Sequence, residues 1–268
     1  MKSIYLLLIL FLFSFSTPKI RDFDKDYTQE LLGKIKSITI KTYEYKYVDK
    51  DTVMWAKTIV QNFDTNNTII NEKFISEFDE YENAFKYQNG LLVEKKAVGD
   101  KNNYTTAYKY DENNNQIEEK SFNNNTFFVQ KERKFDKYRN VIEEKYTSFG
   151  KEVRKTEMEY DYKKKFYLSK TAIDTFKLIF STSKKEFNKK GYITKYQPLN
   201  FYKTFDFQTY EIDKKGNLTK KTLYKNDNTI IETVTYKNTY DKKGNIIVRE
   251  RFLNNKLLEK TTYDIVYL

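Results

Sequence analysis

The stretch YDKKGN at residues 240–245 decides the fold, because residues 212–217 repeat it as IDKKGN. An aspartate at the first turn position can accept hydrogen bonds from the backbone N–H groups ahead of it. A glycine three positions later takes a positive φ at little cost, which completes a tight hairpin turn with a bulge. The predicted turn-forming residues are Asp213, Gly216, Asn217, Asp241, Gly244 and Asn245.

Looser copies of the same turn occur at residues 110–115, 135–140 and 187–192, each followed by a short strand-like stretch. A second, more polar class of turn alternates with them, at residues 123–125, 147–150, 226–228 and 254–255. Residues 63–67 and 88–90 resemble this second class. Turn starts about a dozen residues apart are typical of strand-plus-turn units in an all-β protein.

The composition supports a folded, strand-rich protein with a heavily solvated surface. The chain of 268 residues has a hydrophobic content of 39% and a mean hydropathy of -0.82. Aromatic residues make up 17% of it, and rings that bury roughly 150–250 Å² each can supply a core without much leucine or valine. The chain contains only 2 Pro and 7 Gly, and therefore few residues that would interrupt a strand.

We therefore predict an all-β protein, an antiparallel meander of repeated hairpins that forms an elongated, twisted or partly closed sheet. Residues 35–268 form a single domain that begins with a strand from Ile35 to Tyr47. The apolar stretch 163–182 lacks clear turn chemistry, so an irregular crossover is an alternative for this part of the chain. Residues 17–34 form an N-terminal segment with a short helix that ends at Gly33.

The first 16 residues have the pattern of a signal peptide: a basic start, an apolar run and small residues near Ser16. The run from Ile4 to Phe15 is shorter than the roughly 20 residues that a membrane-spanning helix needs. We expect an exported protein, periplasmic or extracellular, that does not span a membrane after removal of the signal. A lipoprotein anchor is excluded, because the chain contains no cysteine.

The absence of histidine and cysteine excludes most catalytic and metal chemistry. Ser-His and Cys-His nucleophilic catalysis and ordinary zinc sites all need one of these residues. The segment 111–122 lacks the glycine and glutamate that a calcium-binding loop requires. Adjacent carboxylates such as Glu118-Glu119 point to opposite faces of a strand, which is wrong for a shared acid/base site. We expect no enzyme activity, no cofactor and no metal.

One explanation of the formal net charge of +11 is attraction to an anionic partner. Lysines also keep turns and sheet edges soluble, which any such fold needs, and this simpler explanation stays open. Export disfavours nucleic acid and favours an anionic polysaccharide or another envelope component. Exposed aromatic rings on the first strands form a candidate binding platform, although tyrosine is also the preferred half-buried strand residue. This platform comprises Tyr43, Tyr45, Tyr47 and Trp55.

The Tyr-Asp-x-x-Gly-Asn pattern at residues 240–245 resembles the YD repeats of bacterial Rhs-type proteins. The opening from Leu32 to Ile38 is similar to that of small secreted bacterial relatives of unknown function. The asparagine turns are also similar to MORN-type repeats, whose recurrent theme is binding or scaffolding. Large Rhs proteins build a β shell around a toxin, and this chain is too short for that. The resemblance implies an antiparallel repeat architecture rather than an activity.

From these patterns we expect an exported, non-catalytic β-repeat protein that binds or scaffolds at the cell envelope or outside the cell, with anionic glycans as candidate ligands. One alternative is a carboxylate-based carbohydrate-active enzyme. Another is a lipid-carrying or outer-membrane β-barrel. Stretches such as 219–221 and 249–251 place charge on both faces of a strand, which disfavours contact with lipid.

Overall fold

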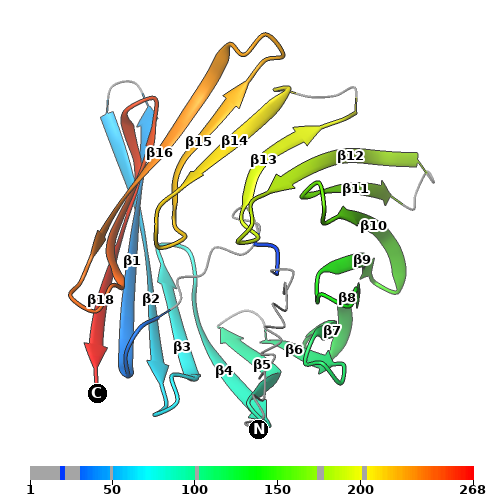
Figure 1. The fold of residues 1–268 in the computed structure, drawn as a ribbon. Coiled ribbons are helices and arrows are strands. Elements are labelled where there is room, and N and C mark those ends of the chain that lie inside the picture. Colours follow the sequence, from blue (N-terminus) through cyan, green and yellow to red (C-terminus); the bar gives the residue numbers. More distant parts are fainter. Residues whose placement is uncertain (1–18, 22–30, 49–50, 100–102, 174–177, 201–203) are drawn as a thin grey trace, which may run out of the picture.

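The computed structural model describes residues 19–21, 31–48, 51–99, 103–173, 178–200 and 204–268. Within these ranges every regular element is a β-strand, and eighteen strands form one sheet in which each strand pairs antiparallel with its sequence neighbour. The predicted all-β antiparallel meander is therefore confirmed (Figure 1). The predicted signal peptide and N-terminal helix lie outside the described residues.

The strands have the following bounds: β1 Ile35–Val48, β2 Asp51–Phe63, β3 Ile69–Ser76, β4 Glu80–Gln88, β5 Leu91–Gly99, β6 Asn103–Tyr110, β7 Gln116–Asn123, β8 Thr126–Phe135, β9 Val141–Ser148, β10 Lys151–Asp161, β11 Phe166–Ile173, β12 Leu178–Phe187, β13 Ile193–Pro198, β14 Phe207–Ile212, β15 Leu218–Tyr224, β16 Ile230–Tyr240, β17 Ile246–Leu253 and β18 Lys256–Tyr267.

The sheet closes on itself, which corrects the expectation of an elongated or partly closed sheet. β1 pairs with β2 on one side and with β18 on the other, so that Ile38 faces Ile265 and Thr42 faces Thr261. In Figure 1 the strands follow one another around a ring, with β18 beside β1. Closure pairs the backbone groups that would otherwise form two open sheet edges, and this gain favours a barrel over a ribbon.

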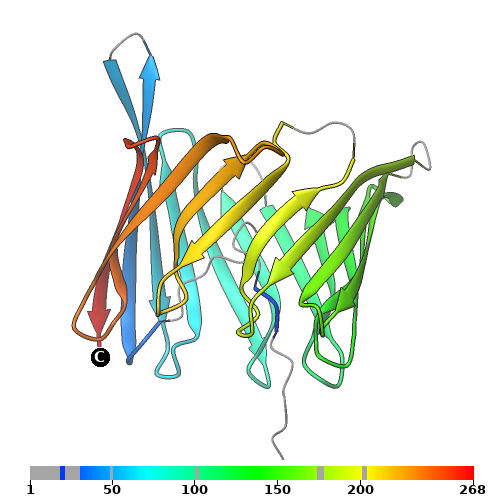
Figure 2. The same ribbon diagram turned by 45° about the horizontal axis from the view of Figure 1, so that its top comes forward.

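The hairpin turns fall on two opposite rims of the barrel. One rim, called the motif rim here, carries the turns that follow β2, β4, β6, β8, β10, β12, β14 and β16, and it includes the repeated Asp turns. Figure 2 shows several of these turns along its lower edge. Residues 63–67 and 88–90 also lie on this rim. The stretch 163–182, for which the sequence also allowed an irregular crossover, contains β11 and the beginning of β12. These two strands pair antiparallel.

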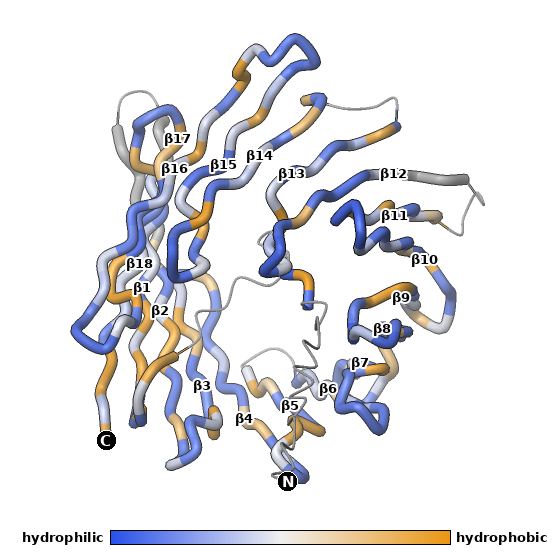
Figure 3. The backbone as a smooth tube through the Cα atoms, viewed as in Figure 1, coloured by the Kyte–Doolittle hydropathy of each residue, from blue (hydrophilic) through white to orange (hydrophobic). Residues whose placement is uncertain are grey.

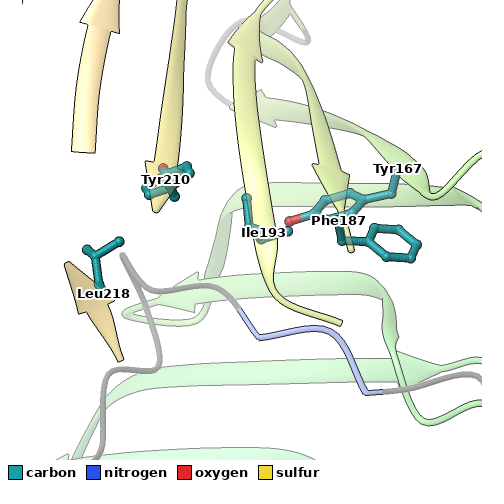
Figure 4. Close-up of a cluster of buried hydrophobic side chains, with 5 residues drawn as sticks. All are labelled: Tyr167, Phe187, Ile193, Tyr210 and Leu218. Carbon is teal, nitrogen blue, oxygen red and sulfur yellow. The ribbon is translucent and has the colours of Figure 1, made fainter. Parts of the chain in front are cut away.

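The larger buried cluster lies on the inner face of the barrel, near the motif rim. It comprises Tyr167, Phe187, Ile193, Tyr210 and Leu218 (Figure 4). Ile20 packs against this cluster, and the short segment 19–21 lies inside the ring of strands in Figure 1. A second cluster of Ile35, Ile38 and Phe63 contacts Leu31 in the same way. Aromatic and aliphatic side chains thus stabilise the inner face beneath the N-terminal segment.

One of the seams of the barrel, the pairings between adjacent strands, is much shorter than the others. β13 and β14 pair at only two positions, Lys195 with Thr209 and Tyr196 with Gln208. The neighbouring pair of β14 and β15 extends over six register positions. The ladder of backbone hydrogen bonds is therefore weakest between β13 and β14.

Candidate binding surface

The Asp turns share one geometry. In the turn that begins at Asp213, Oδ1 accepts hydrogen bonds from the backbone N–H of Lys215 at 2.9 Å and of Asn217 at 2.8 Å. Gly216 has φ +87, and its N–H donates to the carbonyl of Asp213. The turns that begin at Asp64, Asp111, Asp136, Asn188 and Asp241 repeat these contacts.

Tyrosine hydroxyls connect successive Asp turns along the motif rim. Tyr240 donates a hydrogen bond to Oδ2 of Asp213 at 2.6 Å, and its hydroxyl accepts one from Nδ2 of Asn217 at 2.9 Å. Tyr267 contacts Asp241 and Asn245 in the same way, and Tyr162 contacts Asp136 and Asn140. Each of these aspartates therefore uses Oδ1 for the backbone of its own turn and Oδ2 for a tyrosine hydroxyl. Tyr162 and Tyr240 lie at the next turn of the rim, and Tyr267 lies at the end of β18.

These hydrogen bonds lower the pKa of the carboxyl groups of Asp213 and Asp241. Partial burial acts to raise the pKa of Asp213, but the Tyr240 hydroxyl and the N–H of Asn217 lower it more, so the pKa lies below its ordinary value. The pKa of Asp241 is lowered by the same balance, with Tyr267 as the main donor. At Asp111 the side chain of Asn115 is the main cause of a lowered pKa.

Basic side chains are concentrated on one part of the motif rim, called the basic arc here. It extends over five consecutive turns, from the one after β8 to the one after β16. Adjacent turns on a rim are two strands apart, which corresponds to roughly 10 Å. The turns after β2, β4 and β6 contain no lysine or arginine. The residues of the basic arc are Lys137, Arg139, Lys163, Lys164, Lys165, Lys189, Lys190, Lys214, Lys215, Lys242 and Lys243.

The two lysines of each motif copy have different surroundings. The ammonium group of Lys215 lies 3.7 Å from the centre of the Tyr240 ring, and that of Lys243 lies 3.5 Å from the centre of the Tyr267 ring. In these two copies the second lysine thus covers a rim tyrosine through a cation–π contact. The first lysines, Lys189, Lys214 and Lys242, are exposed and have no ion pair within the described part of the chain. Their charge is available to a partner.

The asparagine that ends a turn can also hold the N-terminal segment. Asn245 accepts a hydrogen bond from the N–H of Leu32 at 2.7 Å and donates one to its carbonyl at 2.8 Å. Asn67 contacts the backbone of Gly33 and Ile35 in a similar way. Amide side chains suit this task, because each one offers both a donor and an acceptor to an extended backbone.

The outer wall of the barrel is charged. Residues that pair directly across two strands lie on the same face, so outward-facing Lys109 meets Glu118 at 2.8 Å and Lys134 meets Glu143 at 2.9 Å. Lys220 and Glu211 form another outward pair at 3.1 Å. In Figure 3 hydrophilic colour dominates the strands, and hydrophobic colour occurs in short, separate stretches.

Part of the inner wall carries a chain of ion pairs across β7, β8, β9 and β10. Glu119 contacts Lys131 at 3.1 Å and Arg133 at 3.8 Å. Arg133 in turn contacts Glu144 at 2.9 Å, and Glu144 contacts Arg154 at 3.7 Å. This part of the inner wall is polar, but its charges are neutralised by neighbours.

The predicted aromatic platform on the first strands is placed away from the basic arc. Ile38 of β1 belongs to the second inner cluster, so the alternation of side chains along this strand puts Tyr43 and Tyr45 on its outer face. The side chains of Tyr47 and Trp55 lie outside the described part, so the platform stays a prediction. The clustering of lysines was visible in the sequence, but their convergence on one rim required the strand order.

Two further findings concern only the described residues. None of the described segments forms a helix with the length and apolar character needed to cross a membrane. The described carboxylates do not gather anywhere in groups of three or more that could hold a metal ion.

No protein-family model matches the chain, and no curated protein matches it by sequence. Among solved structures, a porin-like protein from Bacteroides uniformis is 11% identical, with a TM-score of 0.48 over 90% of this chain and 100% of that one. A porin-like protein from Bacteroides vulgatus is 12% identical, with a TM-score of 0.29 over 87% of this chain and 98% of that one. At these TM-scores the likenesses assign neither a family nor a function.

The structure of TcdB2-TccC3 is also similar to this chain. It is 11% identical, with a TM-score of 0.39, and the match covers 83% of this chain. This chain spans 15% of that much longer chain. The resemblance to YD-repeat proteins remains a prediction from the sequence.

Proposed function

We propose that the chain is an exported, non-catalytic barrel that works in water, in the cell envelope or outside the cell, and binds an anionic polysaccharide along its basic arc. The observation that carries this proposal is the row of three exposed lysines on consecutive turns, Lys189, Lys214 and Lys242, which form no ion pair with any residue that the structure describes. A linear polyanion with regularly spaced charges can contact several turns at once. The antiparallel repeat architecture and the resemblance of the turn motif to YD repeats are compatible with such a role.

The outer wall supports an aqueous location. A lysine that faces lipid near the middle of a bilayer costs roughly 2–4 kcal/mol, and ion pairs such as Lys109–Glu118 and Lys134–Glu143 occur on the outer face. In water the same pairs cost little free energy, and their charges disfavour association of the wall with other sheets.

A second candidate function is that of an outer-membrane pore. Closure of an eighteen-stranded sheet favours it, since barrels of 16–18 strands enclose an aqueous channel. The closed architecture fits this alternative better than it fits an elongated scaffold. The two candidates differ in what the outer wall contacts, so partitioning separates them.

The proposed function is tested by binding of the mature chain to dextran sulfate, with uncharged dextran as the reference polymer. Binding should weaken as salt rises from 0.05 to 0.5 M, because salt screens exposed charges. The triple change Lys189→Gln, Lys214→Gln and Lys242→Gln should weaken binding about tenfold, as expected for the loss of several surface ion pairs. A matched control changes Lys41, Lys86 and Lys170 to Gln. These three lysines are exposed on the outer wall, and the net charge falls equally.

Equal losses in the two triple variants would show that net charge alone drives binding and would overturn the proposal for the basic arc. Partitioning is measured with phosphatidylcholine vesicles in the absence of detergent. We expect the mature chain to stay in the aqueous phase and to produce no ion conductance. Stable insertion with conductance would instead establish the pore.

A further inference from the structure

A cavity of about 820 Å³ opens on the inner face of the barrel, where β4 to β9 curve around it. Four tyrosines line it, and Ala97 and Gly99 leave room between them. Its volume falls within the range of roughly 300–1,000 Å³ that is typical of small-molecule sites. The four tyrosines are Tyr81, Tyr104, Tyr108 and Tyr146.

Three of the four charged side chains that line this tyrosine cleft are already paired, and the fourth, Asp79, is exposed. Lys131 contacts Glu119 at 3.1 Å, and Lys95 lies 3.9 Å from Glu72. A charged ligand would have to compete with these partners, whereas an uncharged ligand would leave them in place. The pairing therefore favours an uncharged ligand and sets this cleft apart from the basic arc.

The cleft contains a polar group that lacks a partner. Asn83 is only 1% exposed and donates a hydrogen bond from Nδ2 to Glu72 at 2.7 Å. Its Oδ1 has no hydrogen-bond partner among the described residues. A buried acceptor left in this state costs about 1–3 kcal/mol. A ligand hydroxyl that donates to Oδ1 would remove this cost.

The tyrosines offer both flat rings and hydroxyl groups. Tyr81 stacks on Phe74 with ring centres 4.7 Å apart, which holds its plane, and Tyr104 is 40% exposed. Burial, together with the nearby Glu119 carboxylate, raises the pKa of Tyr108 to about 12, so its phenol stays neutral and can both donate and accept. Thr106 and Ser121 add further hydroxyls to the lining. Thr106 and Ser121 already hydrogen-bond to each other at 3.0 Å, so it is the Asn83 oxygen that a wholly apolar ligand would leave without a partner.

We propose that the tyrosine cleft binds an uncharged, hydroxyl-rich ligand, a segment of a neutral oligosaccharide, with tyrosine rings against the sugar faces and Asn83 accepting from a sugar hydroxyl. Tyrosine suits this task because its ring is apolar while its hydroxyl forms hydrogen bonds. The site is independent of the basic arc, and its occupancy should not depend on salt.

The experiment is isothermal titration calorimetry of the mature chain with cellohexaose, maltohexaose and chitohexaose, at 0.05 and 0.5 M salt. We expect at least one hexasaccharide to bind with the same affinity at both salt concentrations. Asn83→Leu and Tyr108→Ala should each weaken binding at least tenfold. Asn238→Leu is the matched control, because Asn238 faces inward on β16, its Oδ1 also lacks a partner among the described residues, and it does not line the cleft.

A variant that fills the cleft, Ala97→Phe, provides a second test if Asn83→Leu fails to fold. Circular dichroism verifies the fold of each variant before titration. The proposal is overturned if no hexasaccharide binds the unmodified chain, if Ala97→Phe binds as tightly as the unmodified chain, or if Asn238→Leu weakens binding as much as Asn83→Leu. A salt-sensitive affinity would also overturn it, because binding would then depend on charge.

Discussion

The hydroxyl of Tyr240 donates a hydrogen bond to Oδ2 of Asp213 over 2.6 Å and so connects one hairpin turn to the residue that precedes the next. Asp213 uses its other oxygen to hold its own turn. The tyrosine and the aspartate of one motif copy therefore act on different turns. This arrangement makes neighbouring turns of the rim mutually dependent and gives a physical reason for a tyrosine directly before Asp241.

Loss of this hydrogen bond should destabilise the barrel. Tyr240→Phe retains the ring under Lys215 but leaves Oδ2 of Asp213 with only the long 3.5 Å hydrogen bond from Asn217, which should lower the free energy of unfolding by about 1–2 kcal/mol. Tyr224→Phe is the control, because the Tyr224 ring stacks on Phe207 and its hydroxyl forms no hydrogen bond with the residues that the structure describes. Urea denaturation monitored by circular dichroism measures both. Equal stability of Tyr240→Phe and the unmodified chain would contradict a structural role for the connection.

A methyl group at Gly216 should be poorly tolerated for two reasons. The residue has φ +87, and the hydroxyl of Tyr192 occupies the place where a Cβ would lie. Gly150 has a similar φ of +79 but open space around it. We expect Gly150→Ala to cost about 1 kcal/mol from backbone strain alone, and Gly216→Ala about 3 kcal/mol from strain and the clash. Thermal unfolding of both variants tests the difference, and similar costs would show that Tyr192 moves aside freely.

Acid should weaken the motif rim. The pKa values of Asp213 and Asp241 are lower in the folded chain than in the unfolded one, so their contribution to stability is fully present above the unfolded value of about 4. It is lost as the pH falls through the lowered folded values, because protonation removes the hydrogen-bonded carboxylates. The free energy of unfolding, measured from pH 7 to pH 3, should therefore decline below about pH 4.

In the variant Asp213→Asn the free energy of unfolding should decline less steeply below pH 4. The change removes one of the titrating groups, while Oδ1 can still accept hydrogen bonds from the turn. Asp264→Asn serves as the control, since Asp264 is exposed on the outer wall. If the free energy of unfolding declines equally steeply in Asp213→Asn and in the unmodified chain, the Asp213 carboxylate does not contribute to the pH dependence of stability.

The short seam between β13 and β14 should open before any other long-range pairing near it. Only Lys195 with Thr209 and Tyr196 with Gln208 stand in register there, so few hydrogen bonds need to break. We expect amide hydrogens of β14 that face β13 to exchange at least tenfold faster than those of β15 that face β16. Hydrogen exchange read by mass spectrometry or NMR measures this ratio, and uniform protection across both seams would refute the expectation.

The turns were predictable because they depend on neighbours in the sequence. Asp213 and Gly216 lie three residues apart and complete their turn by local hydrogen bonds, whatever the rest of the chain does. The copy at 135–140 shows how strong this local preference is. Arg139 adopts φ 67 in the glycine position, because Asp136 bonds the N–H of Tyr138 and Asn140 on either side of it.

The amino-acid sequence by itself thus determined the hairpins, the all-β class and the alternation of side chains along each strand. The tertiary structure decided that the sheet closes, through pairs such as Ile38 with Ile265 that are distant in sequence. It also decided which face of each strand turns inward. Alternation along a strand defines two faces, but both faces carry charges and aromatic rings, so the sequence does not show which of them faces the interior. The basic arc and the tyrosine cleft exist only after closure brings their strands together.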